Sequence, residues 1–143
     1  MTRFALLALL AAFGADAAEF RSVQENAVVL YDAPSRAAKP LFVVSMHYPL
    51  EVIATSGTWV KVRDHAGALS WIEKKALGDK RMVLVTDPVA EARQRPEEGA
   101  PAAFSATQNV ALELLETAPN GWLRVRHADG ATGYLRAAQV WGD

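Results

Sequence analysis

Two five-residue segments place a tryptophan beside alternating cations. In residues 59–63, Val60 and Val62 alternate with one aromatic and two basic side chains, and residues 122–126 repeat the pattern. If the aliphatic residues of a strand face a core, the alternating ones face outward. An outward tryptophan can stack on sugar or peptide planes, and its cationic neighbours can pair with a carboxylate. The candidate ligand-binding residues, with one nearby aromatic added, are Trp59, Lys61, Arg63, Tyr31, Trp122, Arg124 and Arg126.

The alternative is that these aromatics close the ends of a barrel or the contact between two modules. Trp71 and Tyr134 are expected in the core rather than in a site. Both readings stay open at the level of the sequence.

Catalytic and metal-binding patterns are missing from the sequence. The chain has no cysteine, and its three histidines (His47, His65 and His127) do not have the spacing of helical metal ligands. It contains neither a Gly-x-Ser-x-Gly elbow nor a glycine-rich phosphate loop. Glu97 and Glu98 are adjacent in an expected loop, where carboxylates are usually solvated. We therefore expect a protein that is not an enzyme and that uses no cofactor and no metal.

The overall charge argues against nucleic acid as a partner. The 143 residues carry a formal net charge of -1, which supplies no basic field for a phosphate backbone. Hydrophobic residues make up 51% of the chain, enough for a folded core.

The N-terminus has the layout of a secretory signal peptide. Arg3 precedes an apolar stretch, and Ala15-Asp16-Ala17 offers small residues at the positions that a signal peptidase reads. We expect cleavage after Ala17, with Ala18 as the second choice. The apolar stretch is shorter than the roughly 20 residues of a transmembrane helix. We therefore expect a periplasmic or otherwise exported protein with no stable membrane span after cleavage.

An internal repeat organises the rest of the chain. Residues 59–63 match residues 122–126 at an offset of 63, and the same offset relates Gly67 to Gly130 and Trp71 to Tyr134. Upstream of the tryptophans the offset is 62, as residues 50–55 and 112–117 show. The single inserted residue falls in a segment rich in turn formers, where an extra residue is tolerated. The chain therefore contains an internal duplication.

Each copy is expected to be β structure. Short alternating segments separated by glycine-containing turns indicate a small barrel or sandwich. We expect strands near residues 28–31, 41–45, 50–55, 104–106 and 110–116, besides the two tryptophan segments and the short segments 69–72 and 133–135. In the second copy, Ala90-Glu91-Ala92 replaces the apolar Val28-Val29-Leu30. That substitution predicts a short or poorly paired strand.

The repeated unit resembles the bacterial SH3 family. The matching features are Tyr31-Asp32-Ala33-Pro34, the Trp-Val-Lys-Val-Arg strand, and the closing Gly67-Ala68-Leu69-Ser70-Trp71-Ile72, each with a counterpart in the second copy. The resemblance covers residues from about 24 to 142 and implies an all-β fold of two tandem SH3-like small barrels after a cleaved signal peptide. The expected divisions are a signal peptide (1–17), a first module (18–78) and a second module (79–143), whose residues 79–89 form a connecting strand. We expect the two modules to dock as one two-lobed body.

Two functional hypotheses follow from this reading. The first is a non-catalytic periplasmic binding module that recognises peptidoglycan stem peptide or glycan through the aromatic and basic strands. The second is a protein–protein adaptor or assembly factor that uses the SH3-like grooves to bind a periplasmic protein. The sequence leaves the oligomeric state open.

Overall fold

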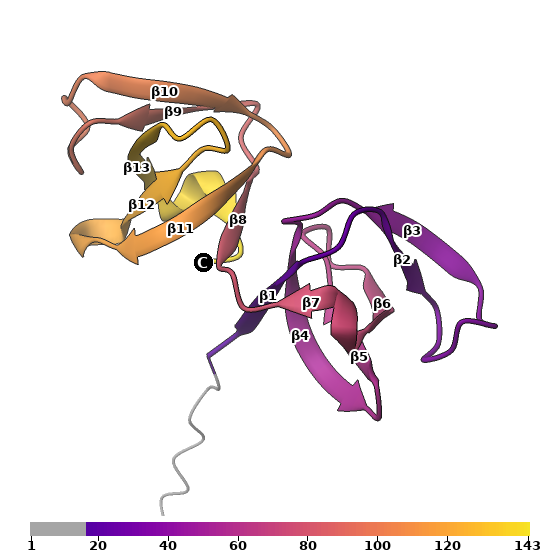
Figure 1. The fold of residues 1–143 in the computed structure, drawn as a ribbon. Coiled ribbons are helices and arrows are strands. Elements are labelled where there is room, and N and C mark those ends of the chain that lie inside the picture. Colours follow the sequence, from indigo (N-terminus) through magenta and orange to yellow (C-terminus); the bar gives the residue numbers. More distant parts are fainter. Residues whose placement is uncertain (1–16) are drawn as a thin grey trace, which may run out of the picture.

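The structure, a computed structural model, describes residues 17–143 as an all-β protein (Figure 1). The expected signal peptide lies outside the described residues except for Ala17. Two seven-stranded antiparallel sheets have the strand orders β3-β2-β6-β5-β4-β1-β7 and β10-β9-β13-β12-β11-β8-β14. The second order is the first with seven added to each number, so the two copies share one topology. The expected fold class, two tandem SH3-like modules, is confirmed.

The strands of the first module are short and are joined mostly by turns. They are β1 (Glu19–Val23), β2 (Val28–Tyr31), β3 (Pro40–Val44), β4 (Pro49–Ser56), β5 (Trp59–Arg63), β6 (Leu69–Glu73) and β7 (Leu77–Gly78), with a 3₁₀ turn at Lys74–Ala76.

The second module repeats this series. Its strands are β8 (Met82–Val85), β9 (Val89–Arg93), β10 (Ala102–Thr107), β11 (Ala111–Thr117), β12 (Trp122–Arg126), β13 (Thr132–Arg136) and β14 (Val140–Trp141), with 3₁₀ turns at Pro119–Gly121 and Ala137–Gln139.

Each module closes around its own hydrophobic core. In the first, Leu30, Leu50, Val62 and Ile72 are fully buried. The second core holds residues that occupy matching strand positions: Val85, Ala92, Leu112, Val125 and Leu135. The alternation read from the sequence is therefore correct for the aliphatic side of β5 and β12. Each buried Leu or Val contributes about 1.5–3 kcal/mol through removal of its side chain from water.

The segment expected to connect the modules is the first strand of the second module. β8 pairs with β11 and β14, just as β1 pairs with β4 and β7. All four residues of β8 are buried, which is why the segment is so apolar. Sequence reasoning missed β1 altogether, although β1 lies 62 residues before the corresponding part of β8.

The expected weakness of the strand that contains Ala90-Glu91-Ala92, which is β9, is wrong. β9 has five residues, one more than β2, and it pairs with β10 at five positions. Ala90 and Ala92 are completely buried. Their small side chains suit this place because a Cβ built on Gly133 would lie 2.9 Å from the Cβ of Ala92. Low side-chain volume here reflects close packing between strands.

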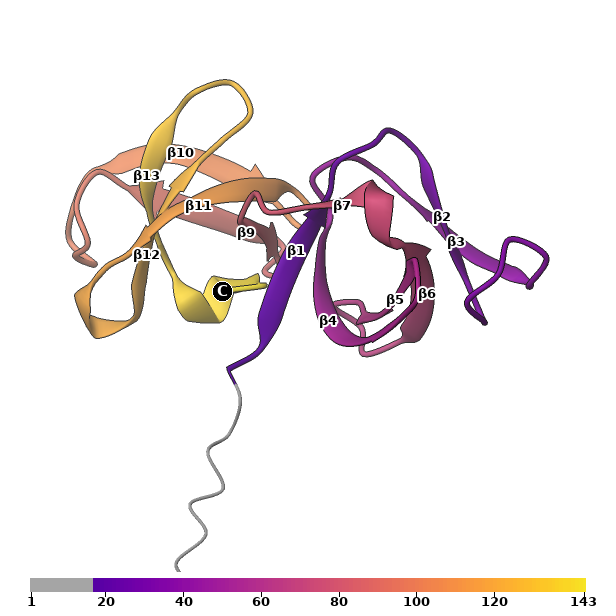
Figure 2. The ribbon, with the colours of Figure 1, turned by 60° about the horizontal axis from the view of Figure 1, so that its bottom comes forward.

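The two modules dock through aromatic residues that come from both ends of the described chain. The ring centroids of Phe20 on β1 and Trp141 on β14 are 5.1 Å apart in an edge-to-face arrangement. The guanidinium carbon of Arg81 lies 5.8 Å from the Phe20 ring centroid, and its Nη2 donates to the carbonyl of Gly142 at 2.9 Å. Figure 2 shows β1 between the two barrels, with the C-terminus beside it. The expected two-lobed body is what the structure has.

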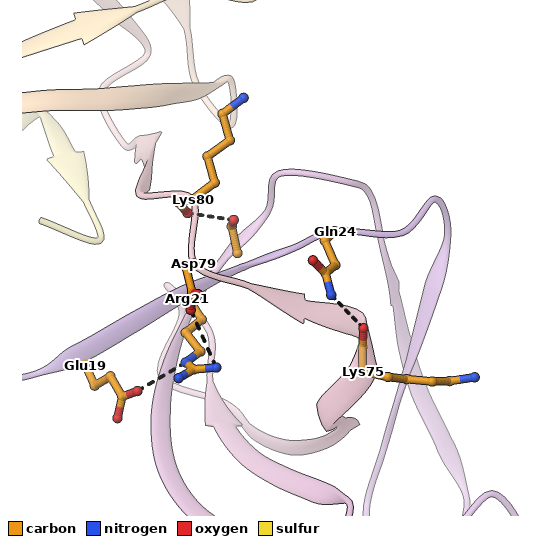
Figure 3. Close-up of polar contacts among 7 residues, drawn as sticks. Glu19, Arg21, Gln24, Lys75, Asp79 and Lys80 are labelled. Carbon is orange, nitrogen blue, oxygen red and sulfur yellow. Dashed lines mark hydrogen bonds and ion pairs between the residues drawn. The ribbon is translucent and has the colours of Figure 1, made fainter.

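Polar contacts from β1 also hold in place the linker between the modules, residues 79–81 (Figure 3). Ser22 Oγ donates to the carbonyl of Lys80 at 2.7 Å, and Arg21 Nη1 lies 3.7 Å from Asp79 Oδ1. Just after β1, Gln24 Nε2 donates to the carbonyl of Lys75 in the 3₁₀ turn that precedes β7, at 2.8 Å. The linker is therefore bonded along one side to the strand that begins the first module.

Candidate functional site

The candidate residues of the first module lie on the outer face of its sheet. In the strand register Tyr31 is opposite Trp71, which is opposite Lys61, while Trp59 is opposite Glu73. Directly opposed residues of antiparallel strands point to the same side. The rings of Tyr31 and Trp59 meet edge to face, with centroids 5.7 Å apart and planes at 83°. The structure thus brings together two of the predicted aromatics, both half-buried.

Trp71 joins this outer face, so its expected place in the core is wrong. The inward positions of β6 belong to Ser70 and Ile72, which are buried. Tyr134 is likewise half-buried and lies opposite Arg124 on the outer side of the second sheet. The alternation of β6 and β13 predicts this arrangement once the inward residues are known.

A pocket of about 210 Å³ borders the Tyr31 ring. Its wall combines apolar groups, Val28 and Val29 among them, with the charged groups of Arg36, Glu73 and Lys75. The Arg36 guanidinium makes two hydrogen bonds to the Glu73 carboxylate. Those bonds, and the charge of Arg36, hold the pKa of Glu73 below its ordinary value. The pocket is therefore an aromatic and aliphatic hollow with an ion pair at its edge.

Neither of the two predicted cations of β5 lines this pocket. Lys61 faces Trp71 on the outer side of the sheet. Arg63 lies further along the strand, where its Nη1 donates to Glu51 Oε2 at 3.2 Å. Arg63 is thus occupied by a neighbouring strand, and the pocket's own guanidinium comes from Arg36. Sequence reasoning missed Arg36, which reaches the site from the loop between β2 and β3.

The second module has a pocket of about 430 Å³ at the matching place, but its tryptophan is covered. Trp122 is only 6% exposed, and the Arg136 guanidinium carbon lies 4.5 Å from its ring centroid. Arg93 stands where the first module has Tyr31, and Arg136 pairs with Glu98. Trp122 is therefore covered by a cation from the next strand.

The ion pairs of the two pockets have reversed charges. At the repeat offsets Arg36 corresponds to Glu98, and Glu73 corresponds to Arg136. Both pairs link the loop between the second and third strands of a module to the end of its sixth strand. This reciprocal exchange was readable from the sequence by comparing the two copies position by position.

The remaining candidates of the second module lie apart from Trp122. Arg124 is opposite Glu116 and Tyr134 in the sheet. Arg126 donates from Nε and Nη2 to Glu113 Oε2, at 3.2 and 2.8 Å. Arg126 and Glu113 border the junction between the modules rather than the pocket beside Trp122.

Within residues 17–143, no three His, Asp or Glu side chains lie close enough together to hold a metal ion. The same part of the chain has no helix of a length and hydrophobicity that would cross a membrane.

Comparison with known families assigns the repeated module. The bacterial SH3 domain family matches residues 24–79 and again residues 87–142. Together these two matches cover most of the chain, and each contains one tryptophan strand and one pocket. The chain belongs to the bacterial SH3 domain family, as a tandem pair. A search of curated proteins finds no match to it.

Among solved structures, the chain is similar to proteins that are about twice as long. NlpC2 from Trichomonas vaginalis is 14% identical with a TM-score of 0.42, and the match covers 91% of this chain and 50% of that one. An NlpC/P60 family protein from Bacillus cereus is 19% identical with a TM-score of 0.41, covering 85% of this chain and 55% of that one. The chain spans about half the length of these proteins.

Proposed function

We propose that the protein is a non-catalytic, exported binding module that recognises peptidoglycan, through stem peptide or glycan, on the outer face of its first SH3 module. The single observation that supports this most is the half-buried Tyr31–Trp59 pair beside a pocket edged by Arg36 and Glu73. Aromatic faces stack on sugar rings and peptide planes, and the ion pair offers both a donor and an acceptor to a zwitterionic peptide.

The second module has a different role in this proposal. Its tryptophan is covered by Arg136, and an arginine replaces the tyrosine of the pocket. We therefore assign wall recognition to the first module alone, with the second serving as its docked support.

The test is co-sedimentation of residues 18–143 with purified sacculi at low and moderate salt. We expect salt-resistant pelleting that is lost in Trp59→Ala and in Tyr31→Ala. Phe42→Ala is the matched control, because Phe42 is also an exposed aromatic of the first module but lies on β3, outside the pocket. Protein that stays in the supernatant under both salt conditions would exclude the peptidoglycan proposal.

A second candidate function, a protein adaptor, is favoured by strand β3. β3 is an edge strand of the first sheet, and Leu41, Phe42 and Val43 are 37%, 47% and 67% exposed. Their counterparts in the second module are Ala103, Phe104 and Ser105, of which Phe104 packs against its core. An exposed apolar edge can take an extended segment of another protein as an added strand. Three side chains are too few for an interface of about 1,200 Å², which favours a short segment over a second copy.

One crosslinking experiment, performed with the periplasm intact, distinguishes the two candidate functions. The adaptor requires one discrete protein partner whose recovery falls in Phe42→Ala and Val43→Ser. It also requires that Trp59→Ala leave that recovery unchanged. Loss in Trp59→Ala alone would count against β3 as the contact.

A further inference from the structure

A cleft at the junction of the modules collects charged residues from three separate parts of the chain. Met46 and His47 come from the loop before β4, Lys80 comes from the linker, and Glu113, Arg126 and His127 come from the second module. Its volume is about 440 Å³, roughly twice that of the pocket beside Tyr31. The cleft is separate from the aromatic face of the proposed function, with which it shares no lining residue.

The first charged element of the cleft is structural and occurs in both modules. Arg126 pairs with Glu113 across β11 and β12, and Arg63 pairs with Glu51 at the corresponding positions of β4 and β5. A pair that both modules keep is explained by cross-strand stability. It therefore does not point to a ligand by itself.

The additional charges are specific to the junction. The residue that corresponds to Lys80 in the first copy is Ala18, and the residue that corresponds to His127 is Asp64. His47 is contributed by the first module to the cleft of the second. Beside the Glu113–Arg126 pair, the cleft is thus lined by Lys80 and by two imidazoles, whereas the first copy has a neutral and an acidic residue at the positions that correspond to Lys80 and His127.

Lys80 and Arg126 keep hydrogen-bond donors that Glu113 does not occupy. Its distance to Lys80 Nζ is 3.9 Å, beyond hydrogen-bond length, so the ammonium can donate its protons elsewhere. Arg126 uses Nε and Nη2 toward Glu113, which leaves Nη1 for another acceptor. The hydrogen bonds of Arg126, followed by its charge and those of Lys80 and His47, keep the pKa of Glu113 below its ordinary value.

The Lys80 side chain is held where a ligand could reach it. Its backbone carbonyl is fixed by Ser22, while its side chain extends away from Arg21 and Asp79 (Figure 3) and remains half exposed. Met46, Ala111 and Ala128 supply an apolar wall in the same cleft. A basic end and an apolar wall together fit a carboxylate attached to a small apolar body.

We infer that the junction cleft is a second binding site, which takes the C-terminal carboxylate of a short peptide with small apolar side chains. Lys80 Nζ and Arg126 Nη1 bind the carboxylate, and Met46 and Ala128 contact the terminal residues. Because the linker and both modules contribute to it, the site exists only in the docked pair.

The test is a titration of residues 18–143, labelled with ¹⁵N, with tri-alanine, with tri-alanine amide and with inorganic phosphate. We expect tri-alanine to shift the amide signals around His47, Lys80 and Arg126, and the amide to bind at least about tenfold more weakly for want of a charged acceptor. Phosphate supplies the charge without the apolar body, so we expect it to bind more weakly than tri-alanine.

Two variants locate the site. Lys80→Gln removes the charge but keeps the backbone carbonyl that Ser22 binds, and it should weaken tri-alanine binding about tenfold. Lys39→Gln, an exposed lysine of the first module outside the cleft, should leave it unchanged. The amide spectrum of each variant reports whether it is folded. Equal affinity for tri-alanine and its amide, equal affinity for tri-alanine and phosphate, or unchanged affinity in a folded Lys80→Gln would overturn the inference.

Discussion

The guanidinium of Arg136 lies over the indole of Trp122, with its carbon 4.5 Å from the ring centroid. Together with the strands below, it leaves that tryptophan 6% exposed, whereas Trp59 in the first module is half-buried and meets Tyr31 by its edge. One tryptophan has thus become part of the packing of its module, and the other remains on the surface.

Trp122→Ala should therefore lower the free energy of unfolding by about 3–5 kcal/mol, as expected for a buried aromatic side chain. Trp59→Ala should lower it clearly less, because its ring is only half-buried. Urea denaturation of both variants measures the difference. Equal losses would mean that the covering of Trp122 by Arg136 has no energetic consequence.

Reversing the ion pair of the first pocket should be tolerated when both partners change. Arg36→Glu and Glu73→Arg each place like charges together, and each should lower the free energy of unfolding only slightly, because solvent screens the charges at this position. The double variant restores an opposite-charge pair of the kind that Glu98 and Arg136 already form. A double-mutant cycle by urea denaturation checks this. Additive losses would contradict the pairing.

Gly133→Ala should destabilise the second module. The new Cβ would lie 2.9 Å from the Cβ of Ala92 and 3.1 Å from the carbonyl oxygen of Arg93. Overpacking of this kind costs about 1–3 kcal/mol. Gly99→Ala is the matched control, because a Cβ there meets nothing within 4 Å. Thermal unfolding of the two variants should show a lower midpoint for Gly133→Ala only.

Much of the fold could be predicted from the sequence, because the repeat and the period of two are carried by single residues. The aliphatic sides of β5 and β12 and the turns that contain Gly67 and Gly130 lie where they are expected. β1 was missed because a strand of five residues shows too little alternation of polar and apolar side chains to be recognised without its partner strands, β4 and β7. Within the segment 79–89 the sequence indicates an apolar strand, but an apolar strand does not reveal which sheet it joins.

The candidate site could be predicted only in part. Strand alternation placed Trp59 and Lys61 on the outer face, but it cannot show that Arg136 covers Trp122 or that Arg36 reaches Glu73 from a loop. Those contacts join residues 14 and 37 positions apart in the chain, and side-chain direction in loops has no sequence period. The junction cleft could not be predicted from the sequence, since it depends on how the two modules dock.

Acidification should weaken the second module through Glu113. The hydrogen bonds and charge of Arg126 lower the pKa of Glu113 below 4.5 in the folded protein. A carboxyl with a lowered pKa contributes stability above its unfolded value, and that stability is lost as the pH falls through the folded pKa. The group is exposed to solvent, so the contribution is below about 1 kcal/mol. Urea midpoints measured from pH 6 to pH 3 should fall less in Glu113→Gln than in the unmodified protein.

Docking of the modules should depend on Phe20. Phe20→Ala removes the ring that contacts Trp141 and Arg81, while the core of each module is left intact. We expect the maximum dimension from small-angle X-ray scattering to increase, and the modules to unfold in two steps rather than one. Phe42→Ala, an aromatic change on β3 away from the junction, is the control. An unchanged scattering profile in Phe20→Ala would show that the linker bonds suffice for docking.

The reversed ion pairs bear on how two similar barrels fold side by side in one chain. The two sheets share one topology, so the β2–β3 hairpin could insert into the second module and the β9–β10 hairpin into the first. Such an exchange would set Arg36 against Arg136 and Glu98 against Glu73. The charge on its loop thus distinguishes each hairpin from its counterpart in the other module. A chain in which the two hairpins were exchanged would be less stable than the correctly assembled one.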